Sequence, residues 1–271
     1  MDNLPKVLVA CPTYEGMSYC LEKFIEKIKS LTYRNYEILI VDNSKTEDYY
    51  NKLKLIKDLK VLRNKQKETN PREKIVNSRN KILEYAKSSS YDFILMMDQD
   101  VIPPVTIIED LLSCNKEIVS GLYFNYFSTS GKTKLLPVAW ASLTPEEFEE
   151  IKKQVKFPPA IKSHEDIRRH LTQEEIESNK VVEVIIPSAG CMLLSKEVFQ
   201  TVGYELLNLK ELGFQDPTVT TTDDIGFIIN AHKKGFKSYV YTKVKCDHLI
   251  SQKYVQDKEG NFIYEGLLKK D

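Results

Sequence analysis

The sequence predicts an α/β fold built on a mostly parallel, doubly wound sheet. Over the first half of the chain, short apolar runs alternate with segments of helical periodicity, which is typical of parallel strands joined by crossover helices. The run Phe93 to Met97 is apolar at every position, as expected of a strand buried on both faces. Two carboxylates, Asp98 and Asp100, follow this run, at the strand end where open α/β sheets bind ligands.

The composition limits the class of protein. With 271 residues, 42% of them hydrophobic and 29% charged, the chain suits one large α/β domain or two closely joined halves. Lys+Arg and Asp+Glu both number 39, so we expect no nucleic-acid partner. The five cysteines contain no C-x-x-C and predict reduced thiols in a cytoplasmic protein. No apolar run approaches about 18 residues and no leader opens the chain, so we expect no transmembrane segment, although peripheral contact with a membrane stays open.

The first half of the chain is expected to place several polar segments at one edge of the sheet. We expect strands at 6–11, 37–44, 60–63, 93–97 and 117–123. We expect helices at 18–30, 53–59 and 73–87 between them. Right-handed crossovers bring the carboxyl ends of the first, second and fourth strands to the same edge. Pro12 to Glu15, Asp42 and Asp98 to Asp100 should therefore share one crevice.

The second half is less regular. Residues 144–180 are dense in charge, and we expect helices to begin near Thr144 and Leu171. This segment forms either a solvated helical insertion or a mobile lid or partner surface. Strands are expected at 181–186, 238–241 and 243–248, and a helix at 220–235. Residues 251–271 are expected to form a C-terminal loop or tail that closes over the site.

Asp98 and Asp100 suggest a cation site. Two close carboxylates repel each other unless positive charge lies between them, and Pro103 and Pro104 favour the turn that would bring them together. Mg²⁺ and Mn²⁺ prefer one or two carboxylates together with phosphate oxygens. The ten glycines include no two within five residues of each other, so a glycine-rich phosphate cradle is absent. A bound diphosphate would depend on a metal and side chains; the alternative is a solvated acidic loop.

Four short motifs, in this order, resemble the nucleotide-sugar-dependent glycosyltransferases of the GT-A fold, notably family 2. They are Pro12-Thr13-Tyr14, Asp42-Asn43-Ser44, Asn77-Ser78-Arg79-Asn80 and Asp98-Gln99-Asp100. The resemblance implies a Rossmann-like, mostly parallel sheet with helices on both faces and a smaller mixed acceptor-side half. Residues 1–125 would then form the nucleotide-sugar-binding half, and 126–250 the acceptor-binding and catalytic half.

The resemblance also implies roles for donor-side residues. Pro12, Thr13, Tyr14 and Glu15 would line the nucleoside pocket, and Asp42 would bind the base. Arg79 would contact the base or phosphate region, although a surface ion pair explains it equally well. Asp98 would reach the ribose or the metal, and Asp100 the metal.

Acceptor-side residues match the family less closely. The acids at the start of the 220–235 helix correspond to the family's acidic pair. The resemblance implies that Asp224 is the catalytic base of an inverting enzyme. Alternatively, both acids serve only to complement the helix dipole, which would also explain their charge. Gly226 and Asn230 depart from the family's usual acid and arginine. His248 corresponds to a third metal ligand, or it has a structural role. The small residues Ser188 to Gly190 either admit a sugar or serve packing.

The resemblance therefore implies a metal-dependent hexosyltransferase that uses Mn²⁺ or Mg²⁺. The donor would be a UDP or GDP sugar, and the acceptor a hydroxyl on a sugar, a lipid-linked molecule or a protein. The Q-x-x-R-W pattern of processive synthases is absent, so we expect single additions. The resemblance, with Asp224 as the base, implies inversion. A retaining GT-A transferase and a non-catalytic nucleotide-sugar-binding module are the alternatives.

Overall fold

The computed structural model describes residues 4–65, 70–129, 132–157, 161–208 and 220–249. It also describes the backbone of two short paired strands, β15 (Tyr254–Gln256) and β16 (Phe262–Tyr264). The expected closure of the C-terminal tail over the site therefore lies outside the described residues.

One eight-stranded sheet forms the centre of the protein, with the strand order β11-β13-β6-β12-β4-β1-β2-β3. The strands are β1 (Val7–Thr13), β2 (Tyr36–Asp42), β3 (Lys60–Arg63), β4 (Phe93–Met97), β6 (Ile118–Leu122), β11 (Val181–Val184), β12 (Cys191–Ser195) and β13 (Ser238–Lys245). Only β12 and β11 run against the other six. The predicted mostly parallel sheet is thus confirmed.

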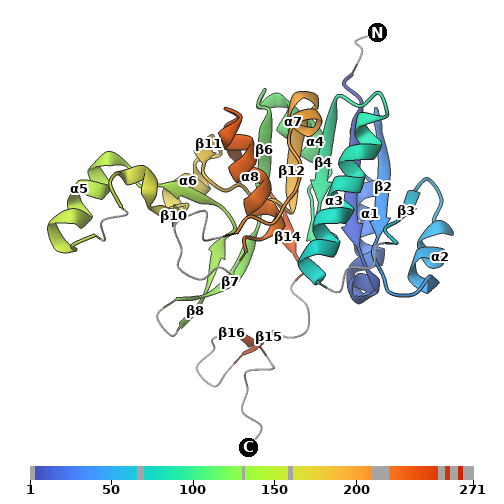
Figure 1. Ribbon diagram of the computed structural model, residues 1–271, viewed down its shortest axis with the longest axis horizontal. Helices are drawn as coiled ribbons and strands as arrows, with labels where there is room; N and C mark the ends of the chain where they lie inside the picture. Colours follow the sequence, from blue (N-terminus) through green and yellow to red (C-terminus); the bar gives the residue numbers. More distant parts are fainter. Residues whose placement is uncertain are drawn as a thin grey trace, which may run out of the picture.

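Helices cover both faces of this sheet (Figure 1). One face packs against α1 (Leu21–Lys29), α2 (Asp48–Lys54) and α4 (Ile107–Ser113). The other face packs against α3 (Pro71–Lys87), α7 (Lys196–Thr201) and α8 (Asp223–Lys233). Because successive side chains of a strand point to opposite faces, Val9 of β1 joins the first cluster and Leu8 the second, which is why the strands are apolar throughout.

The structure corrects two of the expected elements. The helix expected at 53–59 instead spans Asp48–Lys54, because Tyr49 and Leu53 form its buried face whereas Leu55 is 85% exposed. The two strands expected at 238–248 are one strand, β13, whose pairing with β6 shifts register between Val240 and Lys245, followed by the short β14 (Asp247–His248).

The second half carries a hairpin and a projecting lobe. Strands β7 (Phe124–Thr129) and β8 (Lys132–Pro137) form the hairpin. The lobe contains β9 (Trp140–Ser142), α5 (Pro145–Gln154), the short helix η2 (His164–Asp166), β10 (Arg168–His170) and α6 (Gln173–Glu177). Thr144 and Thr172 cap α5 and α6 in full capping boxes. In Figure 1, α5 lies at one extremity of the molecule's long axis.

Candidate active site

A cleft of about 650 Å³ lies at the carboxyl edge of the sheet. It brings together the predicted residues Pro12 to Glu15, Asp98 and Asp100. The other lining residues are Met17, Asn43, Lys45, Pro71, Arg72, Lys74, Ile75 and Gln99. The remaining predicted residues, Asp42, Arg79, Asp224 and His248, do not line this cleft.

The turn after β4 brings His248 beside Asp100. The amide N–H of Val101 donates to the carbonyl of Asp98 at 3.1 Å, which closes the turn that the proline pair favours. The short strand β5 (Val101–Ile102) then pairs with β14, so that His248 lies opposite Val101. As a result, His248 Nε2 is 3.5 Å from Asp100 Oδ2.

The ring of His248 is oriented by its second nitrogen. Nδ1 lies 2.9 Å from the carbonyl oxygen of Phe124, an acceptor, so Nδ1 carries the proton and Nε2 faces Asp100. The edge of the His248 ring also contacts Tyr123, with ring centroids 5.1 Å apart. An oriented imidazole nitrogen beside a carboxylate is a donor set acceptable to Mn²⁺. Within the described ranges, however, no three His, Cys, Asp or Glu side chains gather into a metal-ligand group.

Asp98 points to Arg79. The Arg79 side chain is only 3% exposed, and its Nη2 donates to Asp98 Oδ1 at 2.7 Å. Its Nε lies 2.6 Å from Asp223 Oδ2, and its guanidinium lies over the ring of Tyr204. Arg79 is therefore buried between two acids and is not a surface residue. Desolvation raises the pKa of Asp98 to about 6, with Arg79 opposing and Asp100 assisting the shift.

The two acids at the start of α8 occupy different environments. Asp223 is buried against Arg79, and desolvation raises its pKa while Arg79 opposes the rise. Asp224 is half-buried, and its Oδ1 accepts the N–H of Ile225 at 2.9 Å. The negative charge of Asp224 contributes to the raised pKa of Asp98, which places both acids in one electrostatic neighbourhood.

Asp42 is enclosed. Its side chain has no exposed surface, and its Oδ1 accepts bonds from both the N–H and the hydroxyl of Ser44. Ser44 Oγ in turn accepts the N–H of Glu15 at 2.8 Å, which ties the end of β2 to the loop after β1. Burial raises the pKa of Asp42, although its bonds to Ser44 and the nearby Arg63 oppose the rise. The structure thus shows Asp42 supporting the loop that carries Glu15.

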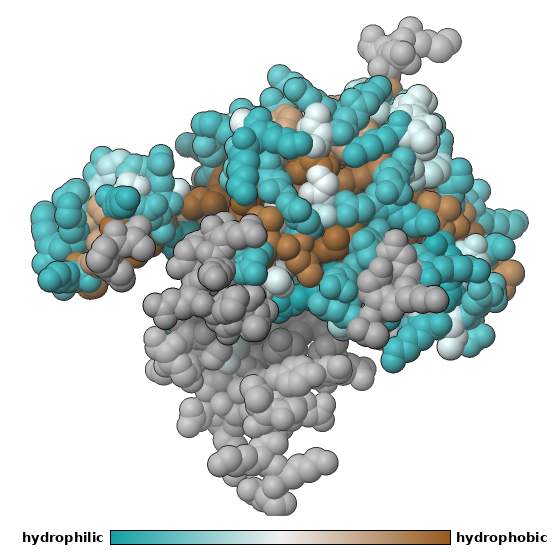
Figure 2. Space-filling model, in the orientation of Figure 1, coloured by the Kyte–Doolittle hydropathy of each residue, from teal (hydrophilic) through white to brown (hydrophobic). Residues whose placement is uncertain are grey.

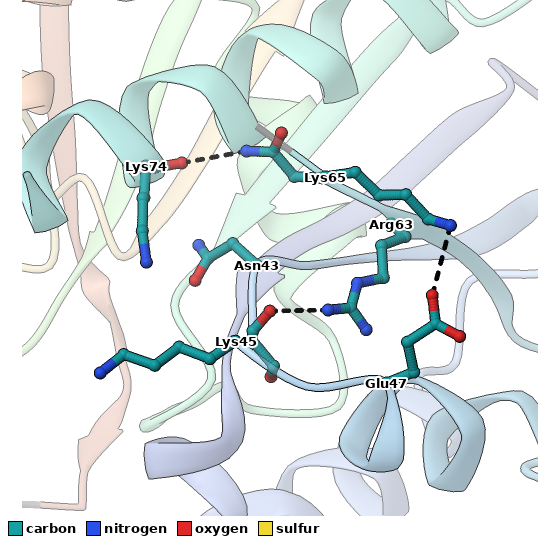
Figure 3. A pocket seen from close by; sticks show the side chains of 8 residues that line it. Asn43, Lys45, Glu47, Arg63, Lys65 and Lys74 are labelled. Carbon is teal, nitrogen blue, oxygen red and sulfur yellow. Dashed lines mark hydrogen bonds and ion pairs between the residues drawn. The ribbon is translucent and has the colours of Figure 1, made fainter. Parts of the chain in front are cut away.

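A basic hollow of about 290 Å³ adjoins the cleft, with which it shares Asn43, Lys45 and Lys74. Lys45, Arg63, Lys65 and Lys74 line it, and Lys65 pairs with its one acid, Glu47, at 3.2 Å (Figure 3). Arg63 Nη2 donates to the carbonyl of Ser44 at 2.8 Å, and Arg63 Nη1 lies 3.5 Å from Asp42 Oδ2. This end of the cleft therefore attracts electron-rich or anionic groups.

Sequence reasoning gave no site role to Arg63, Gln99 and Tyr123, and it identified Asp223 only as a member of the acidic pair at the start of its helix. Arg63 is the last residue of β3, and Tyr123 directly follows β6. Their position at the carboxyl edge of the sheet, where ligands bind, could have identified both as site residues. Gln99 lies between the two acids, and its Nε2 donates to the carbonyl of Met17 at 2.7 Å, holding the short helix η1 (Glu15–Cys20).

Two glycines are explained by close contacts. A Cβ on Gly226 would lie 2.0 Å from the carbonyl oxygen of Glu205, so the acid usual in the family has no room there. A Cβ on Gly190 would lie 3.0 Å from both Asp98 Oδ2 and the Tyr123 hydroxyl. The packing interpretation of Gly190 therefore accounts for its presence.

The chain matches the family described as Glycosyl transferase family 2 over residues 9–203, which is well over half its length. It belongs to that family and has the GT-A fold. No curated protein matches the sequence.

Solved structures with a related fold include GalNAc-T7, crystallised with UDP, GalNAc and Mn²⁺ (TM-score 0.53, 17% identity). The alignment covers 92% of this chain and 44% of that one. The mannosyltransferase PcManGT from Pyrobaculum calidifontis, in complex with GDP-Man and Mn²⁺, gives a TM-score of 0.49 and 15% identity, covering 93% of this chain and 59% of that one. This chain thus spans less than two thirds of either protein. Among its described helices, none has the length and apolar character needed to cross a bilayer.

Proposed function

We propose that this glycosyltransferase moves a hexose from a UDP or GDP sugar to an acceptor hydroxyl, with a divalent cation and with inversion at the anomeric carbon. The cleft at the carboxyl edge of the sheet carries this proposal, because it joins Pro12 to Glu15 with Asp98 and Asp100 beside His248. Donor binding would use residues 1–125, and acceptor binding residues 126–250. The five free cysteines suit a cytoplasmic enzyme.

The donor nucleotide would bind along the cleft through side chains. Tyr14 is 47% exposed there, so its ring is available to stack on a base. Lys45, Arg72 and Lys74 line the same cleft and provide positive charge for a diphosphate. This arrangement replaces the glycine-rich cradle that the sequence lacks.

Asp100 and His248 would hold Mn²⁺ or Mg²⁺, and Asp98, two residues before Asp100, would supply a further carboxylate. Two protein ligands fit such a cation because phosphate oxygens and water usually complete its coordination. When bound, the cation would neutralise the charge that develops on the departing diphosphate.

Asp224 would accept the proton of the acceptor hydroxyl as its oxygen attacks the anomeric carbon. Asp223, the neighbouring acid, is already paired with Arg79 and therefore has a positioning role at the start of α8. Asp224 is the acid of the pair that remains for proton transfer.

A screen of UDP and GDP sugars for Mn²⁺-dependent release of UDP or GDP tests the proposal, with Asp100→Asn as the control. We expect release from at least one donor by the parent protein and none by the variant. A retained anomeric configuration in the product would contradict inversion. Stabilisation by nucleotide and Mn²⁺ without turnover of any donor would instead indicate a binding module.

A further inference from the structure

One buried hydroxyl beside the site has no role in the proposed reaction. Tyr123, the residue after β6, is only 7% exposed, yet no hydrogen bond among the described residues uses its hydroxyl. Nor does this hydroxyl belong to the polar side-chain atoms of those residues that are sealed from solvent without a partner. It is therefore open to the space outside the chain, where water or a ligand satisfies it.

The strand order places this hydroxyl across β12 from the donor-side acids. Because β12 lies between β6 and β4, Gly190, which precedes β12, lies between Tyr123 and Asp98. The amide N–H of Asp98 donates to the carbonyl of Gly190 at 2.9 Å. A Cβ on Gly190 would lie 3.0 Å from both Asp98 Oδ2 and the Tyr123 hydroxyl. Both oxygens therefore border the same small volume beside the Gly190 backbone.

Several contacts hold Tyr123 in this orientation. Its backbone carbonyl accepts the N–H of Val138 at 2.9 Å. Its ring meets the edge of the His248 ring at an interplanar angle of 64°, and the carbonyl of Phe124, the next residue, fixes His248 in turn. The phenol is thus already ordered before any ligand arrives, which lowers the cost of binding one.

The sugar of a bound donor has to lie between the metal ligands and the catalytic base. Its anomeric carbon is bonded to the phosphate that the cation would hold beside Asp100 and His248, and the acceptor that Asp224 activates attacks the same carbon. Tyr123 contacts His248. Burial raises the pKa of Tyr123 far above its usual value, and the charges of Asp98 and Asp224 raise it further, so the phenol is a protonated donor between these groups.

The surroundings suit a sugar. In Figure 2 apolar residues are visible near the centre of the molecule, where Figure 1 shows α8 and β14, with hydrophilic residues around them. Apolar surface with a few well-placed polar groups is the usual composition of a small-molecule site. A sugar ring matches such a site, because it presents C–H groups to the apolar surface and hydroxyls to the polar groups.

We propose that the Tyr123 hydroxyl donates a hydrogen bond to a hydroxyl of the transferred sugar, and so selects among donor sugars by the position of that hydroxyl. This inference rests on the proposed function and adds to it a residue that contacts the sugar itself. A site built to bond a substrate hydroxyl binds analogues that lack the hydroxyl poorly, because its own polar group is left unpaired.

Replacing Tyr123 with Phe tests the proposal, because it removes the hydroxyl and keeps the ring against His248. Titrations of the full 271-residue protein in Mn²⁺ compare UDP with UDP-glucose and UDP-galactose, and GDP with GDP-mannose. Tyr123→Phe should bind at least one sugar nucleotide about tenfold more weakly than the parent, and free UDP or GDP equally well. An unchanged Mn²⁺ requirement separates contact with the sugar from an effect through His248.

The matched control is Tyr33→Phe, which removes another buried hydroxyl. Tyr33 is 6% exposed, and its hydroxyl donates to the carbonyl of Pro5 at 2.7 Å, before the first strand and away from the cleft. This variant should bind every ligand like the parent. Equal weakening of sugar-nucleotide binding in the two variants would show a general effect of lost stability and would overturn the proposal.

Donors that lack single hydroxyls identify the contact. Among UDP-glucose analogues that each lack one sugar hydroxyl, one should bind the parent about tenfold more weakly than UDP-glucose and bind Tyr123→Phe with no further loss. The proposal is overturned if the parent binds all the analogues equally, if Tyr123→Phe binds every sugar nucleotide like the parent, or if the parent binds UDP or GDP but none of their sugars. If neither UDP nor GDP binds the parent, the donor site itself is wrong and the proposed function falls as well.

Discussion

Arg79 Nε lies 2.6 Å from Asp223 Oδ2, which joins the middle of α3 to the first turn of α8 inside the protein. The same guanidinium donates to Asp98 at the end of β4. One buried cation thus links the donor-side turn to the helix that carries Asp224. Removing one partner of a buried ion pair usually costs more than the pair contributes, because the remaining charge stays buried and uncompensated.

Replacing Arg79 with Met should therefore lower the free energy of unfolding by about 3–5 kcal/mol, as measured by urea denaturation. Arg79→Lys keeps the charge but lacks the fork that reaches both acids, so its loss should be intermediate. Adding Asp223→Asn to Arg79→Met should recover part of the loss. A loss below about 1 kcal/mol in Arg79→Met would show that the two contacts do not stabilise the fold.

The adjacent acids of α8 give a matched pair of variants. Asp224→Asn should abolish sugar transfer, because no carboxylate remains to take the acceptor proton, while stabilisation by nucleotide and Mn²⁺ is unchanged. Asp223→Asn should lower stability and retain measurable transfer, because it weakens the contact with Arg79 and spares the proposed base. Normal transfer by Asp224→Asn would remove Asp224 from the proposed role.

Asp42 should contribute to the stability of the protein even when no nucleotide is bound. Replacing it with Ala leaves the buried N–H and hydroxyl of Ser44 without their acceptor and Arg63 without its neighbouring charge. We expect a loss of about 2–4 kcal/mol in the free energy of unfolding of the nucleotide-free protein, against about 1 kcal/mol for Ser44→Ala. If Asp42→Ala unfolds like the parent and only loses nucleotide affinity, direct base contact is its main role.

The contrast between Asp98 and Arg79 shows what could be predicted from the sequence. Asp98 and Asp100 follow an apolar strand, so local pattern and the topology of parallel sheets were enough to place them at the edge. The pairing of Arg79 with Asp223 joins residues 144 positions apart in sequence through two helices packed on one face, and no local pattern encodes that distance. Asp42 illustrates the same limit, because its burial depends on Arg63 arriving from the neighbouring strand β3.

Metal dependence should localise to Asp100 and His248. Removing divalent cations with a chelator should abolish the stabilisation that UDP or GDP gives the parent protein, and Mn²⁺ should restore it. His248→Ala should raise the Mn²⁺ concentration needed by at least about tenfold, since even groups that only orient ligands contribute that much. Asp247→Ala, which alters the exposed neighbour, is the control. Equal Mn²⁺ dependence in the parent and His248→Ala would exclude His248 as a ligand.

The lobe should lose stability in acid. A hydrogen bond from the backbone of Thr144 lowers the pKa of Glu147. Burial raises the pKa of Glu175, but hydrogen bonds from Arg169 and Thr172 outweigh this effect, so that the pKa of Glu175 is also lowered. Both glutamates bind protons more weakly in the folded state than in the unfolded chain. Their contribution to the free energy of unfolding is therefore complete above the unfolded pKa of about 4.3, and it is lost as pH falls through their lower pKa values in the folded protein. The unfolded chain then binds more protons, so stability rises with pH over this interval.

Trp140 reports this transition, because it is the only tryptophan in the chain and β9, which contains it, pairs with β10 of the lobe. The midpoint temperature of unfolding, followed by Trp140 fluorescence, should fall between about pH 5 and about pH 3 in the parent. The double variant Glu147→Gln, Glu175→Gln should start lower and fall less over the same interval, since it has lost the groups that titrate. Parallel pH profiles for the two proteins would show that Glu147 and Glu175, both paired with Arg169, do not control the acid stability of the lobe.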